Sequence, residues 1–134
     1  MNLTQQEKQA LVDLANAARQ RAYAPYSNYH VGAAILADDG RIFTGVNVEN
    51  ASYGLTICAE RAAVFSAITA GARRLLAVAI CTEYGGSPCG ACRQVMSEFA
   101  GDIPVWLSDS TGKARETSLH TLLPDHFGPN HLPV

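Results

Sequence analysis

The chain begins with an amphipathic segment whose apolar residues recur at helical spacing. Thr4-Gln5-Gln6-Glu7 fits a capping box, in which the side chains of Thr4 and Glu7 each bond the other's backbone. The apolar positions that follow share one helical face: Leu11, Leu14, Ala15 and Ala18. This pattern predicts a first helix over about residues 5–22, closed by Pro25.

The rest of the chain alternates short apolar strands with helical stretches. Strands are predicted at about 30–37, 41–48, 75–82 and 103–107, with a weaker fifth strand after a turn at 109–112. Helices are predicted at about 58–70, 89–100 and 118–123. The run 75–82 is almost entirely apolar, which is typical of a strand buried on both faces. Strands that alternate with helices favour a layered sheet with helices on its faces.

Composition and charge narrow the range of partners. The 134 residues are 48% hydrophobic and 16% charged, as in an ordinary globular chain. The net charge is −2 and the longest basic run is Arg73-Arg74, which speaks against a protein that follows DNA or RNA. No apolar stretch approaches the roughly 20 residues that span a bilayer, and no secretion signal is visible. We therefore expect a cytoplasmic chain with no nucleic-acid partner and no membrane partner.

Three of the four cysteines lie where predicted helices begin. Cys58 starts one helix, and Cys89 and Cys92 lie in the first turn of another. A helix N-terminus carries partial positive charge and free N–H groups, which favour the thiolate, the form of cysteine that binds zinc. Cys89 and Cys92 are three residues apart, so both sulfurs can face one point. Three protein ligands leave the fourth tetrahedral position open, as in catalytic rather than structural zinc sites.

Two charged residues beside Cys58 complete a candidate catalytic centre. Zinc held by three thiolates has a net negative formal charge, which weakens its pull on the proton of a bound water molecule. The helix N-termini and the guanidinium of Arg61 could offset this charge, with Arg61 bonding the sulfurs. Glu60 lies beside the metal without being a ligand, so its carboxylate can take a proton from zinc-bound water and deliver it elsewhere.

Other interpretations of the cysteines remain open at this point. Cys89 and Cys92 alone could form a redox dithiol of the thioredoxin type, but that leaves Cys58 and Glu60 unexplained. A structural zinc site would need a fourth ligand, from Cys81 or from a histidine. Cys81 lies within an apolar strand, where a cysteine is usually a small buried hydrophobe. The histidines show no ligand spacing: His30, His120, His126 and His131.

The order of these residues resembles that of a known enzyme family. Cys58-Ala59-Glu60 followed by Pro88-Cys89-Gly90-Ala91-Cys92 is similar to the signature of zinc nucleobase deaminases. Four further segments resemble the short, homotetrameric cytidine deaminases: Ala24-Pro25-Tyr26-Ser27, Val31-Gly32-Ala33-Ala34, Asn47-Val48-Glu49-Asn50-Ala51 and Leu122-Leu123-Pro124. With the order of elements, the resemblance implies an α/β fold, a three-layer sandwich with a five-stranded mixed sheet flanked by helices. It also implies a single catalytic domain over residues 1–134.

The resemblance further implies contacts to a nucleoside. Asn47 and Glu49 match a pair that grips the ribose 3′-hydroxyl, and residues two apart on a strand would face the same way. Taken alone, these two residues would also suit a solvated strand end. Tyr29 stands where the family usually has Phe, lining the pyrimidine pocket or stacking on the base. Ala59 would offer backbone hydrogen bonds to the edge of the base.

Two aromatic residues match positions that reach into the active site of a neighbouring subunit. They are Tyr53 and Phe127, and they imply a homotetramer with shared active sites. Taken alone, Phe127 is only an aromatic residue in a proline-rich tail and could dock on its own domain.

These implications predict a hydrolase with one zinc ion per chain. Its expected reaction is the deamination of cytidine and deoxycytidine to uridine and deoxyuridine with release of ammonia, in pyrimidine salvage. The closest alternative is a deaminase of another aminopyrimidine nucleoside, such as a blasticidin-S-type enzyme, against which Glu49 and Tyr53 argue. A polynucleotide editor is disfavoured by the lack of a basic surface. A non-enzymatic zinc module would need a fourth protein ligand.

Overall fold

The predicted helices and strands are present in the predicted order. The computed structural model describes residues 3–133. Its strands are β1 (Gly32–Ala37), β2 (Ile42–Val46), β3 (Leu75–Cys81), β4 (Pro104–Ser108) and β5 (Ala114–Ser118). Its α-helices are α1 (Gln5–Arg19), α2 (Ala59–Thr69), α3 (Gly90–Glu98) and α4 (Leu119–Leu122), with additional 3₁₀ turns at Tyr53–Leu55 and Pro129–His131. No helix in this described part of the chain is long and apolar enough to cross a membrane.

The five strands form one mixed sheet in the order β2-β1-β3-β4-β5. β1 pairs antiparallel with both β2 and β3, and β5 pairs antiparallel with β4. β3 and β4 are parallel, and α3 connects them because parallel neighbours need a crossover. The prediction of an α/β fold built on a five-stranded mixed sheet is confirmed.

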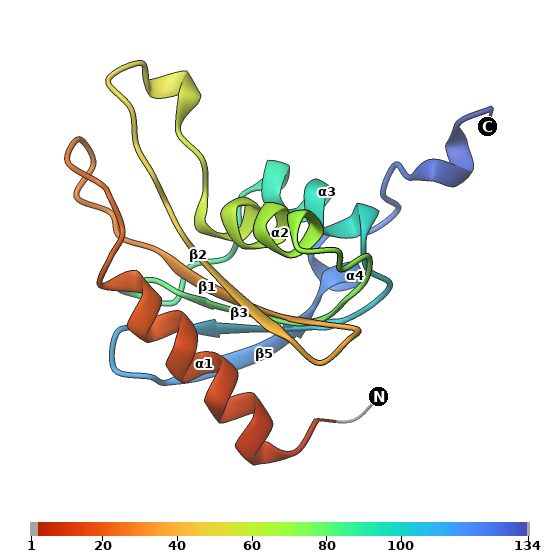
Figure 1. The fold of residues 1–134 in the computed structure, drawn as a ribbon, viewed down its shortest axis with the longest axis horizontal. Coiled ribbons are helices and arrows are strands. Elements are labelled where there is room, and N and C mark those ends of the chain that lie inside the picture. Colours follow the sequence, from red (N-terminus) through yellow and green to blue (C-terminus); the bar gives the residue numbers. More distant parts are fainter. Residues whose placement is uncertain (1–2, 134) are drawn as a thin grey trace.

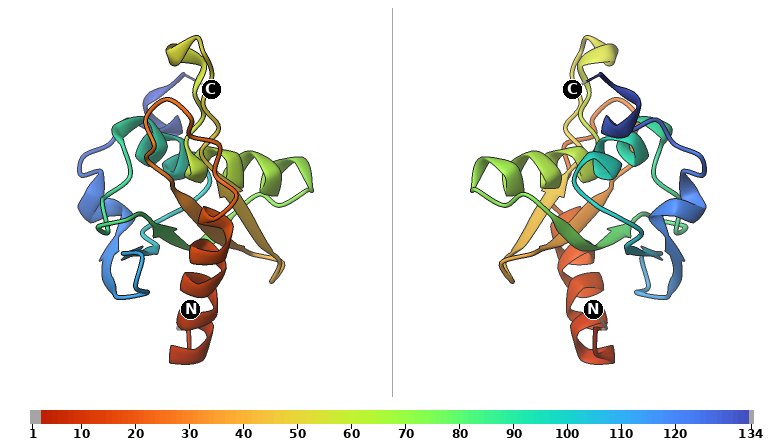
Figure 2. Two further views of the ribbon diagram at one scale, coloured as in Figure 1. Left: turned by 90° about the vertical axis from the view of Figure 1, so that its left-hand side faces the viewer. Right: turned by 90° about the vertical axis from the view of Figure 1, so that its right-hand side faces the viewer.

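Helices cover both faces of this sheet and produce three layers (Figure 1). α1 packs on β1 and β3, whereas α2 packs on β2 and β1 from the other side, where α3 lies beside it. The side views in Figure 2 show that the axes of α1 and α2 run in different directions. β3 is apolar on both faces, as its sequence predicts. Val78 and Ile80 belong to the cluster that includes α2 and α3, and Ala77, Ala79 and Cys81 belong to the cluster that includes α1.

α1 ends at Arg19, three residues before the predicted end near residue 22. Its start agrees with the prediction, since Glu7 N donates to Thr4 Oγ1 at 3.1 Å and Thr4 N donates to Glu7 Oε1 at 2.9 Å. Beyond Arg19 the chain leaves the helix, and Tyr23 forms a β-bridge with Val48. A pairing with a distant segment therefore ends the helix before any helix-breaking residue is reached.

β2 is also shorter than predicted, because at Asn47 the side chain takes over one of the two bonds that would continue the backbone ladder. Asn47 N donates to Val31 O at 3.3 Å, and Asn47 Oδ1 accepts from Val31 N at 2.9 Å. Asn47 Nδ2 donates to Tyr29 O at 2.7 Å. The buried amide of Asn47 thus joins the end of β2 to the loop that leads into β1.

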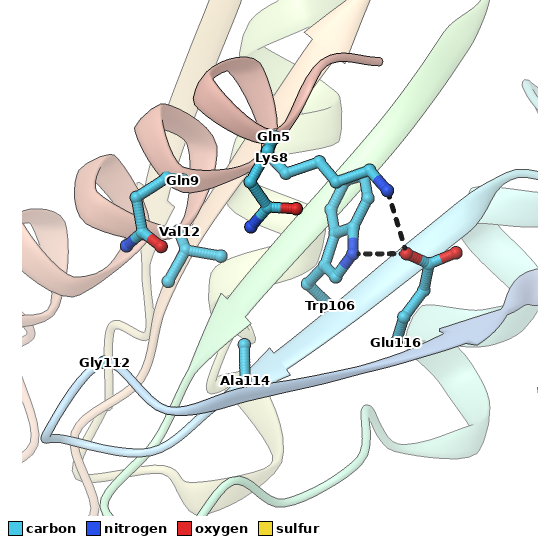
Figure 3. Close-up of a pocket in the computed structure, with 8 residues that line it drawn as sticks. All are labelled: Gln5, Lys8, Gln9, Val12, Trp106, Gly112, Ala114 and Glu116. Atoms are coloured by element: carbon cyan, nitrogen blue, oxygen red, sulfur yellow. Dashed lines mark hydrogen bonds and ion pairs between the residues drawn. The ribbon is translucent and has the colours of Figure 1, made fainter. Parts of the chain in front are cut away.

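A hollow of about 250 Å³ lies between α1 and β5 (Figure 3). Trp106 of β4 lines this hollow, and its Nε1 donates to Glu116 Oε1 at 2.8 Å. Lys8 Nζ lies 3.5 Å from the same oxygen, so the two charged side chains neutralise each other. None of the predicted site residues lies here. The hollow is a seam where α1 meets the hairpin of β4 and β5.

Gly45 of β2 determines how closely α2 approaches the sheet. A Cβ atom on Gly45 would lie 2.4 Å from Ala63 N and 2.5 Å from Ala59 O, both of which are backbone atoms of α2. Backbone atoms in a packed helix cannot move aside as a flexible side chain can. A glycine is therefore required here for α2 to lie directly on β2.

Gly45→Ala should destabilise the fold. The added methyl group meets helix backbone, so we expect the free energy of unfolding to fall by at least the ~1–3 kcal/mol typical of overpacking. Chemical denaturation would measure the change. Gly101→Ala is the matched control, because the nearest atom to its added Cβ is a side-chain nitrogen of Arg74 at 3.9 Å. Equal stability of the two variants would contradict the close approach.

Candidate metal centre and active-site cavity

The N-termini of α2 and α3 converge and bring three cysteines together. Cys58 is the N-cap of α2 and Cys89 is the N-cap of α3, both in extended backbone conformation. Cys92 lies one turn into α3 and is fully buried. α3 begins after the loop that follows β3, so the centre lies near the carboxyl end of that strand, where ligands commonly bind in α/β sheets.

The spacing of the three sulfurs fits a zinc ion. Cys58 Sγ lies 3.8 Å from Cys89 Sγ, and Cys89 Sγ lies 3.5 Å from Cys92 Sγ. All three sulfurs lie within 4.8 Å of one another. Tetrahedral zinc with Zn–S bonds of about 2.3 Å separates its sulfurs by about 3.8 Å. The three predicted ligands can therefore hold zinc with little movement and leave a fourth position open.

Cys81 does not belong to this centre. Its side chain is buried among the residues that pack against α1, on the other face of the sheet. Burial raises the pKa of the Cys81 thiol, as expected for a cysteine that acts as a small hydrophobe. Within residues 3–133, no other set of three potential ligands comes together. The prediction that Cys81 is a core residue agrees with this placement.

Hydrogen bonds and a guanidinium stabilise a thiolate at Cys58. A hydrogen bond from Cys92 and the nearby Arg61 lower the pKa of Cys58 to about 5. The pKa of Cys92 is raised, because its hydrogen bond to Cys58 and its burial both disfavour a second thiolate. Arg61 Nη2 donates to Cys58 Sγ at 3.3 Å, as predicted for a residue that offsets thiolate charge. Arg61 Nε is buried without a protein partner.

Glu60 lies in the first turn of α2, two residues after Cys58, and only 4% of its surface is exposed. Burial raises the pKa of its carboxyl group, and the nearby Cys58 contributes in the same direction. A buried acid with a raised pKa beside a metal centre is a common feature of catalytic sites.

A cavity of about 290 Å³ opens over these groups. It contains seven of the predicted site residues: Tyr29, Asn47, Glu49, Cys58, Ala59, Glu60 and Cys89. The remaining lining residues were not predicted as site residues: Ser27, Val31, Thr56, Ile80, Thr82 and Ser87. Thr82 follows the last residue of β3, and its Oγ1 accepts from Gly86 N at 2.7 Å. This bond folds the loop that leads to Ser87 back on the end of β3. Its position at the end of a buried strand is the signal that could have identified it.

The strand argument for Asn47 and Glu49 is wrong, although both residues line the cavity. β2 ends at Val46, so neither lies in the strand. Asn47 bonds the backbone of the loop before β1, as described above. Glu49 Oε1 accepts from Tyr26 N at 2.9 Å and from Ser27 N at 3.1 Å, and its other oxygen accepts from the Ser27 hydroxyl. The Ser27 hydroxyl is the main reason that the pKa of Glu49 is lowered.

Tyr29 projects from this same loop, and about half of its surface is exposed. Its hydroxyl lies close to Gly86, where a Cβ atom would come within 3.1 Å of it. The extra hydroxyl of Tyr29, compared with the Phe usual in the family it resembles, is therefore accommodated by a glycine on the opposite loop.

Tyr53 and Phe127 lie outside the cavity. Tyr53 lines an adjacent hollow with Tyr26, and the two rings are 5.6 Å apart. Phe127 is held in the C-terminal tail, where its carbonyl accepts from Gln94 Nε2 at 2.9 Å and its ring stacks on His131. Both aromatic side chains are more than half exposed, at 74% for Tyr53 and 57% for Phe127.

Comparison with known proteins agrees with these features. The family described as "Cytidine and deoxycytidylate deaminase zinc-binding region" matches residues 5–106. A cytidine deaminase of Sporosarcina psychrophila is 46% identical over 125 residues, covering 91% of this chain and 92% of that protein. One from Mycobacterium tuberculosis is 50% identical over 127 residues, covering 89% of this chain and 88% of that protein.

A solved structure supports the same relationship at the level of the fold. The crystal structure of cytidine deaminase from Burkholderia pseudomallei superposes with a TM-score of 0.85 at 52% identity, covering 93% of this chain and all of that one. The family match includes all three cysteines and Glu60. This chain therefore belongs to the zinc-dependent cytidine and deoxycytidylate deaminase family.

Proposed function

We propose that this chain is a single-domain hydrolase that deaminates cytidine and deoxycytidine to uridine and deoxyuridine, with release of ammonia, in pyrimidine salvage. The observation that carries the proposal is a three-cysteine cluster, two of whose members line a cavity, beside a buried glutamate that lines the same cavity. The identity to cytidine deaminases over most of the chain supports the same reaction.

Cys58, Cys89 and Cys92 would hold the zinc ion, one per chain. Bound zinc would lower the pKa of a water molecule and so supply a nucleophile. Arg61 and the two helix N-termini stabilise negative charge on the sulfurs, because a guanidinium bond and backbone N–H groups both favour thiolate.

Glu60 would move the protons of the reaction. Its carboxyl group is buried beside the cluster, and burial raises its pKa, which favours the protonated form that a proton donor needs. We assign to it the transfer of one proton from the attacking water to N3 of the pyrimidine when C4 is attacked, and later the transfer of the other, from the new C4 hydroxyl, to the departing amino group. A single carboxylate at this position can serve both steps, because N3 and the amino nitrogen belong to the same edge of the base.

The remaining cavity residues would bind the nucleoside. Ala59 is the first residue of α2, where backbone N–H groups lack helical partners and can bond the base edge. Tyr29 offers an aromatic face at the mouth of the cavity. Asn47 and Glu49 would bond the ribose 3′-hydroxyl with the donor and acceptor capacity left after their loop contacts.

Tyr53 and Phe127 would act across subunits of a homotetramer. Both are exposed and neither lines the cavity of its own chain, which supports a role in a neighbour's site. Their exposure also fits an interface, where aromatic residues are enriched. We place the working enzyme in the cytoplasm, where unpaired cysteines stay reduced and available to a metal.

The ligand assignment predicts how zinc content responds to cysteine substitution. The wild-type chain should contain close to one zinc per chain, and Cys58→Ala, Cys89→Ala or Cys92→Ala should lose it. Cys81→Ala should retain it, because Cys81 lies on the α1 face of the sheet. Metal analysis of the purified proteins would measure this. Loss of zinc from Cys81→Ala with retention in Cys58→Ala would show that the ligand set is wrong.

The role of Glu60 predicts a large loss of rate without loss of metal. Glu60→Gln should retain zinc but release ammonia from cytidine at least 10²–10⁴-fold more slowly, the range typical of a positioned acid–base group. Glu98→Gln, which changes an exposed carboxylate at the end of α3, is the matched control and should keep full activity. Normal turnover by zinc-loaded Glu60→Gln would exclude this role, and a wild-type chain that releases no ammonia from cytidine would refute the proposed function.

The shared site predicts complementation between two inactive chains. A Glu60→Gln chain and a Tyr53→Ala, Phe127→Ala chain should each be inactive or weak alone, but mixed assemblies should recover activity. Recovery is expected because an intact Glu60 can then meet intact aromatic residues of a neighbour. Subunit exchange must first be demonstrated by pull-down of a tagged chain. Exchange without recovered activity, or a fully active monomer by light scattering, would exclude shared active sites.

A further inference from the structure

Arg93 bonds two backbone carbonyls that belong to distant segments. It follows Cys92 on α3, and its Nε donates to Pro88 O at 2.8 Å. Its Nη1 donates to Leu122 O at 2.7 Å. Pro88 directly precedes Cys89, and Leu122 is the last residue of α4, from which the C-terminal tail departs. One guanidinium therefore joins the loop that leads into the metal centre to the start of the tail.

Cys89 depends on such a contact more than the other two cysteines do. Cys92 is fully buried in the main core cluster, and Cys58 packs against that cluster. Cys89 is exposed and lies at the junction of loop and helix. Pro88 is buried but the Cys89 side chain is not, so packing does not fix the sulfur directly and the orientation of the Pro88–Cys89 peptide determines where it lies. A charge-assisted bond to Pro88 O holds that peptide, and such bonds are about twice as strong as neutral ones.

The tail depends on α3 in a similar way. Residues 124–133 contain no strand, no α-helix and no buried residue, so packing contributes little to their position. Arg93 satisfies Leu122 O, which lies at the end of α4 where carbonyls lack helical partners. The next residue, Gln94, donates from Nε2 to Phe127 O at 2.9 Å. Two consecutive side chains of α3 thus hold the tail at two points, one of them at Phe127.

We propose that Arg93 is a positioning residue that sets Cys89 and the C-terminal tail together, while Gln94 holds the tail alone. The inference rests on the proposed function, because it takes Cys89 as a zinc ligand and Phe127 as part of an active site. The planar guanidinium is required, since its separate N–H groups reach carbonyls in two directions at once. Lysine retains the charge but presents it at one point.

The test compares four variants that differ in which bonds they lose. Arg93→Met loses both carbonyl bonds and keeps an unbranched apolar stem, and Arg93→Lys keeps the charge. Gln94→Met loses only the bond to Phe127. Arg73→Met is the matched control, because Arg73 also donates to two backbone carbonyls, of Ile68 and Ala72, at the far end of α2.

Three readouts that do not require turnover separate positioning from general stability. Zinc affinity is measured by competition with a chromogenic chelator, and the geometry of the thiolates by the visible spectrum of the cobalt-substituted protein. The position of the tail is measured by the rate of chymotrypsin cleavage after Phe127 in zinc-loaded protein, with oligomeric state monitored by light scattering. KM and kcat for cytidine are then measured for each variant that is active.

Arg93→Met should bind zinc about 10–100-fold more weakly, the usual cost of removing a residue that orients a ligand, with an altered cobalt spectrum and faster tail cleavage. Arg93→Lys should fall between it and wild type, and it carries the test if Arg93→Met does not fold. Gln94→Met should show faster cleavage and a raised KM with unchanged zinc affinity. Arg73→Met should change none of the three readouts.

The inference would be overturned by folded Arg93 variants with wild-type zinc affinity, cobalt spectrum and tail cleavage. An equal loss of zinc in Arg73→Met would also overturn it, by showing that the effect is one of general stability. If the wild-type chain had no activity on cytidine, the proposed function would fail, whereas zinc affinity and tail cleavage would still decide whether Arg93 couples the two segments.

Discussion

Three thiols held within 4.8 Å of one another are the constraint on which the rest of the site depends. Negative charges at that distance repel, so the cluster needs positive partners before it can bind a metal as thiolates. Two helix N-termini and Arg61 provide them, and both helices must therefore begin at the same edge of the sheet. The close contact of α2 with Gly45 and the crossover from β3 through α3 to β4 produce that convergence.

Much of this architecture could be predicted from local sequence signals. The capping box at Thr4 and the two-sided apolar run of β3 each specify an element without reference to the rest of the chain. The metal ligands are predictable for a similar reason, because Cys89 and Cys92 lie one helical turn apart and Cys58 starts a helix. The ends of α1 and β2 were predicted too far along the chain, since pairing of Tyr23 with Val48 and the amide of Asn47 determine them.

The contacts that shape the cavity are less accessible to sequence reasoning, because they join residues far apart in the chain. Glu49 folds the loop at Ser27 around its carboxylate, and no periodicity connects these two residues. Arg93 lies next to a predicted ligand, but its two acceptors are backbone carbonyls that carry no side-chain signature. Resemblance to a family identified Glu49 as a site residue, but the resemblance did not show which contacts hold Glu49 in place.

The distribution of charge in the cavity bears on the choice of substrate. Two carboxylates, Glu49 and Glu60, line it together with thiols, hydroxyls and apolar groups, and none of its lining residues is basic. Because the pKa of Glu49 is lowered, its carboxylate stays charged at neutral pH and repels an added phosphate. The chain as a whole is also slightly acidic, with a net charge of −2. Electrostatics inside the cavity and over the whole chain therefore favour a neutral nucleoside over a nucleotide or a polynucleotide, which agrees with the proposed reaction.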